Sequence, residues 1–330
     1  KEDSKEKPEI KEKPEIKEKE EIHDEKSGKT NSDFPLNQIL FGPPGTGKTY
    51  NTVNMALDIV CPEGSQWDKE PRDKARSKYQ KMLGAGQIVF VTFHQSMSYE
   101  DFIEGIKPEP TKDGKITYEV KDGIFKELCA KAENDESQNY VIIIDEINRG
   151  EISKILGELF FSIDPGYRGK AGEVATQYSN MHTDPNDKFY IPENVYIIGT
   201  MNDIDRSVDS FDFAMRRRFR FVEVKAEDTQ DMLESLDDEE LKAEAIVRMD
   251  KLNEEILCVP DLNENYQIGA SYFLKLKVLD FDDLWTDYLQ PLLQDYVCGL
   301  NDEEDCMKRF ARAYGYTASV EGDSDEAANN

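Results

Sequence analysis

The sequence holds few of the residues that build metal centres and disulfide frameworks. Its 330 residues include five cysteines and three histidines, and no two cysteines form a CxxC pair. Cysteines that are odd in number and scattered along the chain predict reduced thiols and a cytoplasmic protein. Because the histidines show no ligand spacing either, the sequence carries no zinc signature.

Long apolar runs are also missing. The longest, Ile88–Phe93 and Val141–Ile144, are far shorter than the roughly 18 residues that a membrane-spanning helix needs. No signal-peptide pattern opens the chain. We therefore expect no membrane partner.

Positive charge is the third shortage. The chain has 41 Lys and Arg residues against 69 Asp and Glu, which gives a formal net charge of −28. This balance argues against a surface that neutralises nucleic-acid phosphates or docks on anionic lipids. Residues 225–330 contain 27 acidic and 9 basic residues, so most of the excess lies in the C-terminal third.

Both ends of the chain have the composition of disordered segments. A hexamer of alternating charge, KEKPEI, KEKPEI and KEKEEI, fills residues 5–22, and the last ten residues are small and acidic. Such segments cannot bury a core. We predict a disordered charged linker at 1–32 and a disordered acidic tail at 321–330. The chain begins at Lys1, from which we expect a fragment or processed form with a tethered module upstream.

Between the ends, short β-branched runs alternate with helical patterns. This alternation predicts an α/β domain at 33–225, a parallel β-sheet flanked by helices. A turn signal before Lys115–Val120 predicts a hairpin inserted between the second and third strands. After residue 226 the strand signal fades, and helical patterns predict a smaller α-helical domain at 226–320. The expected strands are Gln38–Phe41, Ile88–Phe93, Val141–Asp145, Val195–Thr200 and Phe219–Val224.

The strongest motif follows the first strand. It fits the P-loop pattern GxxxxGK[ST] and directly precedes a helical pattern, the context that makes the motif credible. Its glycines let backbone N–H groups cradle phosphates, while Lys48 should reach the β- and γ-phosphates and Thr49 should bind Mg²⁺. We predict nucleotide binding by Gly42, Pro43, Pro44, Gly45, Thr46, Gly47, Lys48, Thr49 and the following Tyr50.

A second motif ends the third strand. Asp145 and Glu146, hereafter the acidic pair, follow an apolar run of four residues. Adjacent residues at a strand end point differently and can take two roles. We predict that Asp145 holds Mg²⁺ and that Glu146 orients and deprotonates the attacking water.

Two further sites follow. Asn202, at the tip of the fourth strand, could hydrogen-bond the γ-phosphate or the lytic water. Arg216, Arg217 and Arg218 end a short helix, where positive charge suits the helix dipole. Three arginines in a row in an acidic protein suggest an anion contact, and we predict that Arg216 or Arg217 reaches a neighbouring subunit's γ-phosphate.

Two other features leave alternatives open. The segment 269–273 could close over a nucleotide or could pack in the core. Four basic residues could line the pore of a ring or could be ordinary surface charge, namely Arg149, Lys154, Arg168 and Lys170.

In this order the motifs resemble those of an AAA+ nucleoside triphosphatase, and more narrowly the McrB subunits of McrBC modification-dependent restriction endonucleases. The similarity spans about residues 34–275. Its most specific part is the segment at 201–207, where Asp203 and Ile204 replace the usual Thr-Ala and add a carboxylate beside the site. Other similar segments are Phe93-His94-Gln95-Ser96, residues 99–106, residues 145–150 and residues 197–202.

The resemblance implies a function and partners. It implies hydrolysis of GTP, or of ATP, with Mg²⁺, and it places Asp205 and Arg206 beside Asn202 in the hydrolysis site. It further implies a homo-oligomeric, hexameric ring and a McrC-like nuclease subunit that stimulates hydrolysis. DNA would be read by an N-terminal domain absent from this chain, or by a partner. The preference for guanine rests on the resemblance alone, because a P-loop contacts only phosphates.

Two other functions remain open. One is an ATP-dependent remodelling ATPase of the MoxR type that acts on proteins. The other is a nucleotide-binding assembly scaffold with little hydrolysis, against which Glu146 and Asn202 argue.

Overall fold

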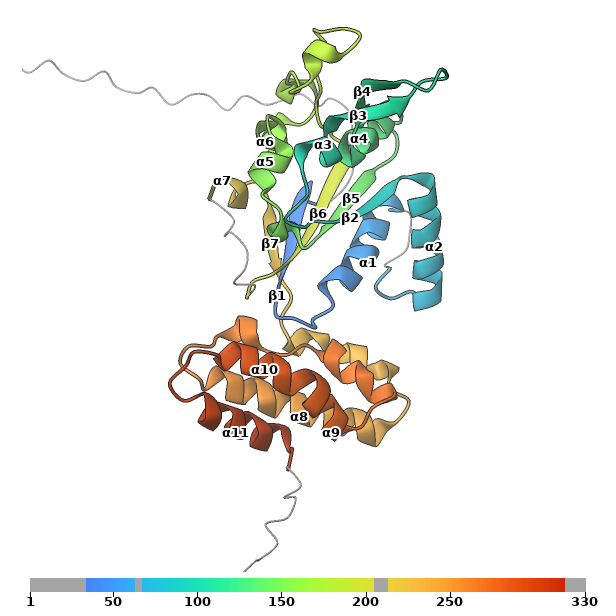
Figure 1. Ribbon diagram of the computed structural model, residues 1–330. Helices are drawn as coiled ribbons and strands as arrows, with labels where there is room; N and C mark the ends of the chain where they lie inside the picture. Colours follow the sequence, from blue (N-terminus) through green and yellow to red (C-terminus); the bar gives the residue numbers. More distant parts are fainter. Residues whose placement is uncertain (1–33, 63–66, 205–212, 318–330) are drawn as a thin grey trace, which may run out of the picture. The chain divides into compact units, whose positions relative to one another are not determined.

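The computed structural model describes residues 34–62, 67–204 and 213–317. At its centre is a sheet of five strands in the order β2-β5-β6-β1-β7, with every pairing parallel (Figure 1). All five predicted strands are confirmed, as is the α/β class. The strands are β1 (Asn37–Gly42), β2 (Ile88–Thr92), β5 (Tyr140–Asp145), β6 (Val195–Asn202) and β7 (Arg220–Glu223).

Both faces of this sheet are buried, which explains why its strands are apolar throughout. In β5, Val141 and Ile143 pack in one hydrophobic cluster, while Ile142 and Ile144 pack in another. Successive side chains of a strand point to opposite faces, so the two clusters cover opposite sides of the sheet. The first cluster lies under α1 (Lys48–Val60) and α2 (Arg72–Ala85), and the second under α4 (Ile124–Asn134).

Shorter elements complete this part of the chain. Between Ile152 and Ser162 the chain forms two short helices, separated at Gly157, whose positive φ of 52° favours glycine. The remaining elements are α3 (Tyr99–Phe102), η1 (Ile147–Arg149), α5 (Ile152–Leu156), α6 (Leu159–Ser162), η2 (Pro165–Tyr167), η3 (Gly169–Gly172), η4 (Ser179–Met181) and α7 (Phe213–Arg216).

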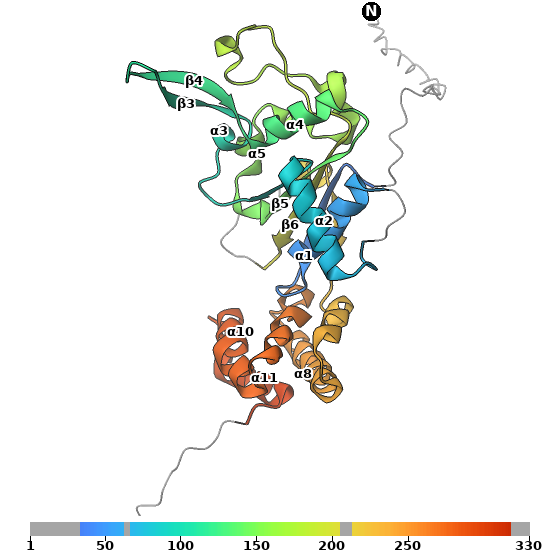
Figure 2. The ribbon, with the colours of Figure 1, turned by 90° about the vertical axis from the view of Figure 1, so that its right-hand side faces the viewer.

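The predicted hairpin is confirmed as a separate antiparallel pair (Figure 2). It consists of β3 (Glu104–Pro110) and β4 (Ile116–Asp122). At its base the fully buried Glu104 carboxylate accepts from Lys126 Nζ at 2.5 Å and contacts His182 Nε2 at 2.9 Å. A buried charge needs such partners, and here they tie the hairpin to α4 and to the 163–194 segment.

Residues 227–314, hereafter the helical part, have a hydrophobic core of their own around Trp285 and Phe310. Helices appear where they were expected, although the segment at 281–297 contains a π-helical turn. The exact domain boundaries stay a prediction. The elements are η5 (Glu227–Ser235), α8 (Glu239–Leu257), η6 (Glu264–Tyr266), η7 (Ala270–Lys277), α9 (Phe281–Leu284), η8 (Trp285–Leu289), α10 (Gln290–Val297) and α11 (Glu303–Tyr314).

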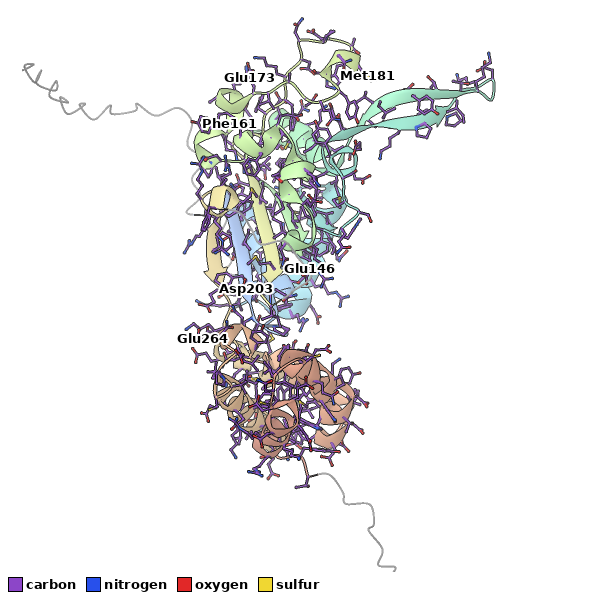
Figure 3. All side chains as sticks on the ribbon, turned by 60° about the vertical axis from the view of Figure 1, so that its left-hand side comes forward. Glu146, Phe161, Glu173, Met181, Asp203 and Glu264 are labelled. Atoms are coloured by element: carbon purple, nitrogen blue, oxygen red, sulfur yellow. The ribbon has the colours of Figure 1, made fainter. Side chains whose placement is uncertain are left out.

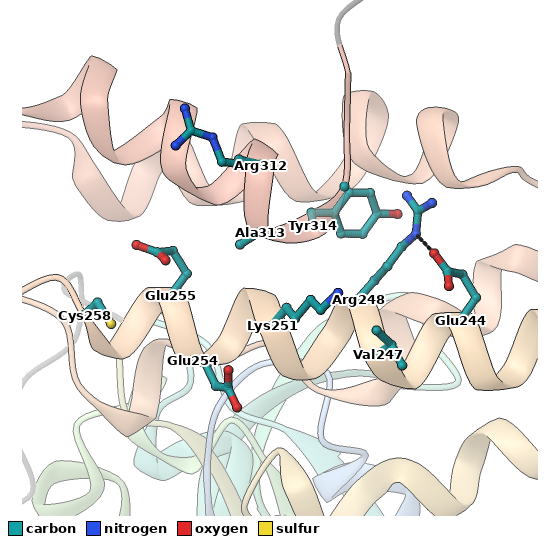
Figure 4. A pocket seen from close by; sticks show the side chains of 11 residues that line it. Glu244, Val247, Arg248, Lys251, Glu254, Glu255, Cys258, Arg312, Ala313 and Tyr314 are labelled. Carbon is teal, nitrogen blue, oxygen red and sulfur yellow. Dashed lines mark hydrogen bonds and ion pairs between the residues drawn. The ribbon is translucent and has the colours of Figure 1, made fainter.

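A surface hollow of about 380 Å³ lies along α8 and α11 (Figure 4). Arg248 donates to Glu244 at 2.8 Å, and its guanidinium covers the rings of Phe281 at 4.2 Å and Tyr314 at 5.3 Å. The hollow contains none of the predicted site residues. Within the described ranges, no helix combines the length and apolar character of a membrane span.

Asn253 offers a test of how the helical part is held together. Its buried side chain donates to Ile268 O at 3.0 Å and accepts from Ile268 N–H at 2.7 Å. Asn253→Ala leaves both backbone groups unpaired, so we expect the free energy of unfolding to fall by about 2–4 kcal/mol in denaturant titration. The control is Asn134→Ala, an exposed α4 residue, which should cost less than about 0.5 kcal/mol. Equal losses in the two variants would contradict this account.

Candidate functional site: a P-loop above an acidic pair

The P-loop, residues 42–49, joins β1 to α1 at the carboxyl edge of the sheet. Its backbone requires glycine. Gly42 has a φ of 140°, and a Cβ there would lie 2.4 Å from Val224 O. Gly45 has a φ of 80°, and a Cβ there would collide with the ring of Tyr272. An L-residue would strain both positions. The loop therefore has the strand-to-helix context that the motif requires, with its amides at the start of α1.

Lys48 is the buried cation of this loop. Its Nζ donates to Gly42 O at 2.9 Å and to Pro43 O at 2.7 Å. Burial lowers the pKa of Lys48 to about 8, and the negative charges of Glu146 and Asp145 partly oppose that shift. Among the described residues no carboxylate contacts this ammonium directly, and a desolvated cation of this kind is suited to an anionic ligand.

Asp145, at the end of β5, connects the P-loop to the neighbouring strand. Its Oδ1 accepts from Thr49 Oγ1 at 2.7 Å and from Thr200 Oγ1 at 2.7 Å. The predicted pair of magnesium ligands, Thr49 and Asp145, is thus in direct contact. A hydroxyl and a carboxylate fit Mg²⁺, which prefers hard oxygen ligands and is commonly bound by one or two side chains with phosphates and water.

Glu146 points to a different set of partners. Its φ of 52° is the only positive value among non-glycine residues in the described part of the chain. Glu146 lies at the lower end of the sheet as drawn in Figure 3, directly after β5. Glu146 Oε1 accepts from Asn202 Nδ2 at 2.7 Å, and Oε2 accepts from Arg149 Nε at 3.3 Å. The structure therefore brings Glu146 and Asn202 together, as the motifs suggested, but Asn202 contacts the carboxylate itself.

Sequence reasoning missed two residues here. Thr200 contacts both members of the acidic pair, because it also accepts from Glu146 N–H at 3.1 Å. Arg149, considered only as a pore residue, pairs with Glu146. The period of a strand could have revealed Thr200, since residues 200 and 202 share one face of β6. The spacing of three residues between Glu146 and Arg149 could have indicated their contact, which forms across the single turn of η1.

The segment 269–273 packs in the core, which confirms one of the two alternatives considered for it, and it also lies against the P-loop. Ala270 and Phe273 are fully buried in the core of the helical part. The backbone also contacts the P-loop, since Gly269 N–H donates to Pro44 O and Ser271 N–H to Gly45 O, each at 3.0 Å. Closure over a nucleotide stays a prediction.

The three arginines separate by burial. Arg218 is buried, donates to Ala214 O at 2.5 Å and covers the ring of Phe160 at 4.4 Å, so it stabilises the fold. Arg216 and Arg217 are exposed. They remain the two candidates for a contact in trans.

The remaining predicted site positions are Asp205, Arg206 and Tyr50. Asp205 and Arg206 lie outside the described residues. Tyr50 is partly exposed, with the guanidinium of Arg72 at 4.5 Å from its ring centre. The adjacent Asp203 accepts from Asn265 Nδ2 at 2.6 Å, so the carboxylate that sets this segment apart contacts the helical part.

The pore assignment of Arg168 is wrong. Only 5% of Arg168 is exposed, its guanidinium donates to Asn37 Oδ1 at the start of β1, and burial lowers its pKa to about 10. Lys154 is exposed and pairs with Glu151 at 2.5 Å, and Lys170 is exposed. Arg168 therefore packs the amino edge of the sheet and cannot line an opening.

These features define an AAA+ P-loop protein, and comparison with known families agrees. Residues 76–219 match the AAA domain of the dynein-related subfamily, and residues 244–305 match the alpha-helical lid domain of McrB. The combination favours an McrB-type protein over the MoxR type. This chain belongs to the McrB family of AAA+ proteins.

Two curated relatives are similar over most of the chain. The EcoKMcrB subunit of the type IV methyl-directed restriction enzyme of Escherichia coli K12 is 35% identical over 243 residues, covering 72% of this chain and 47% of that protein. Component YdiS of the type II restriction enzyme BsuMI of Bacillus subtilis 168 is 25% identical over 222 residues, covering 58% of each. This chain thus spans about half the length of the curated relatives it matches.

The lowered pKa of Lys48 predicts a pH dependence of nucleotide binding. Phosphate favours the protonated amine, and with a pKa of about 8 in the free protein the protonated fraction falls as pH rises past 8. The affinity for a non-hydrolysable nucleoside triphosphate analogue should therefore fall about tenfold between pH 7 and pH 9 by calorimetry. The nucleotide phosphates, with a second pKa near 6, are already ionised in this range.

Lys48→Met is the matched control for this dependence. It should bind the analogue weakly and show no slope over the same pH range. A wild-type affinity that stays constant from pH 7 to pH 9 would contradict the assigned role of Lys48.

Proposed function

We propose that this chain is the nucleotide-hydrolysing motor subunit of a McrBC-like DNA restriction system, with GTP as its preferred substrate. The observation that carries the proposal is the contact network beneath the P-loop. Thr49 meets Asp145, and Glu146 meets Asn202, so groups from three adjacent strand ends gather beside a phosphate-binding loop.

In this proposal the P-loop amides and Lys48 hold the phosphates, with Tyr50 beside them. Thr49 and Asp145 hold Mg²⁺, which when bound neutralises charge on the β- and γ-phosphates. The carbonyls of Pro44 and Gly45 accept hydrogen bonds from backbone N–H groups of the helical part. These bonds restrict the backbone of the P-loop. Positioning and electrostatics of this kind supply most of the catalysis in phosphoryl transfer.

Glu146 is the proposed base for the attacking water. Asn202 fixes the direction of its carboxylate, and both Asn202 and Arg149 donate to it. Asp205 and Arg206 would complete the hydrolysis site, as the resemblance implies.

The proposed assembly is a hexameric ring in which an exposed arginine, Arg216 or Arg217, reaches the neighbouring subunit's γ-phosphate. A McrC-like nuclease would stimulate hydrolysis, and DNA would be read by a domain or partner outside this chain, in the cytoplasm. The printed names of the two relatives, a subunit and a component of restriction enzymes, support a multi-subunit system. The acidity of residues 225–330 also agrees with recognition of DNA by a domain or partner outside this chain.

Hydrolysis of GTP and ATP, with and without a McrC-like nuclease, tests the function. We expect GTP turnover to exceed ATP turnover and to rise with the nuclease. Glu146→Gln is the matched control and should lower kcat by about 10²- to 10⁴-fold while still binding nucleotide, because only the base is removed.

Each alternative has its own outcome in this experiment. Faster turnover of ATP than of GTP would overturn the guanine preference. Binding with no turnover under either condition would favour the scaffold. Unchanged turnover in Glu146→Gln would remove Glu146 as the base.

Mixing variants tests the arginine contact in trans. Arg216→Ala or Arg217→Ala should lose about 10³-fold or more in kcat, as removal of an arginine finger does. Adding Glu146→Gln subunits, themselves inactive, should restore turnover, because they supply the missing arginine to a neighbour whose Glu146 is intact. Arg218→Ala should instead lower the melting temperature. If mixing restores nothing, the arginine does not act between subunits.

A further inference from the structure

Thr200 lies at the centre of the site network. It belongs to β6, which lies between β5 and β1 in the sheet, and its Cα partner in β1 is Leu40. Only 2% of Thr200 is exposed. A buried hydroxyl needs partners for its one donor and its acceptor lone pairs. The partners of the Thr200 hydroxyl therefore show which groups this residue can orient.

Both partners of Thr200 belong to the acidic pair. Its Oγ1 donates to Asp145 Oδ1 at 2.7 Å and accepts from Glu146 N–H at 3.1 Å. One oxygen thus contacts the side chain of the first residue and the backbone of the second. A hydrogen bond to the carboxylate of the proposed magnesium ligand restricts its rotation and fixes which oxygens face outward. Thr49 approaches the same Oδ1, so Asp145 is held from two adjacent elements.

The contact with Glu146 N–H has a different consequence. Glu146 has a φ of 52°, a left-handed conformation that is unfavourable for a non-glycine residue. This conformation turns the Glu146 side chain away from the path of Asp145 and toward Asn202. The bond from Glu146 N–H to Thr200 helps to offset the cost and fixes where the base leaves the strand.

We infer that Thr200 is a positioning residue for nucleotide hydrolysis, whose single hydroxyl sets the directions of both members of the acidic pair. The inference rests on the proposed function of the site. Thr200 acts through Asp145 and Glu146 and does not itself contact the reacting atoms. Together with Asn202, two residues further on the same face, it makes β6 the strand that orients the groups at the end of β5.

Thr200→Val tests the inference because it keeps the shape and removes the hydroxyl. We expect kcat for GTP to fall about 10- to 100-fold, as loss of a bond that orients a metal ligand does, and the Mg²⁺ concentration for half-maximal turnover to rise. KM should change less than about threefold, because the P-loop contacts remain. Thr200→Ser, which restores the hydroxyl, should recover most of kcat.

Ser162→Ala is the control for loss of a buried hydroxyl elsewhere. Ser162 is fully buried and donates to Gly172 O, with no contact to the acidic pair. This variant should lower the melting temperature and leave kcat unchanged. If Thr200→Val does not fold, Thr200→Ala takes its place in the same comparison with Thr200→Ser.

The outcomes separate this inference from the proposed function. Wild-type protein that hydrolyses no nucleotide defeats the proposed function. Wild-type protein that turns over GTP, with an equal kcat in folded Thr200→Val or Thr200→Ala, overturns the role of Thr200 alone. A kcat loss that Thr200→Ser fails to recover also overturns it, because the hydroxyl would then not be the group responsible.

Discussion

Parallel pairing of β5, β6 and β1 is the constraint on which the site depends. In a parallel sheet all carboxyl ends meet at one edge, so the acidic pair, Asn202 and the P-loop converge although they are far apart in sequence. The pairing has a simple cause. Each strand is apolar on both sides, and α1 and α4 cover opposite faces. The chemistry therefore follows from burial of hydrophobic side chains that take no part in it.

The two neighbouring carboxylates at this edge of the sheet have different hydrogen-bond partners. Asp145 accepts from hydroxyls, which leave its negative charge available to a cation. Glu146 accepts from the side-chain amide of Asn202 and from the guanidinium of Arg149. The left-handed turn at Glu146 creates this difference, because it directs two adjacent side chains to separate partners.

The sequence predicted the regular elements well because their patterns are local. The β-branched runs, the P-loop glycines and the hairpin turn each specify their own backbone. Prediction from the sequence failed for side chains whose burial depends on contacts with residues elsewhere in the fold. Arg168 reads as a surface cation, yet it donates to Asn37 at the far end of the sheet. Arg218 reads like its neighbours, yet the ring of Phe160 and the carbonyl of Ala214 bury it. Neither contact leaves a periodic trace in the sequence.

The sequence by itself determined the class of protein, the nucleotide-binding loop and the two carboxylates, because spacing between a strand, glycines and a helix is a local property. Only the tertiary structure decided which side chains meet. Thr200 and Arg149 became part of the site through contacts with Glu146 and Asp145 across strands and turns. Hydrogen bonds depend on distances of a few tenths of an ångström, and those are set by packing of the whole sheet.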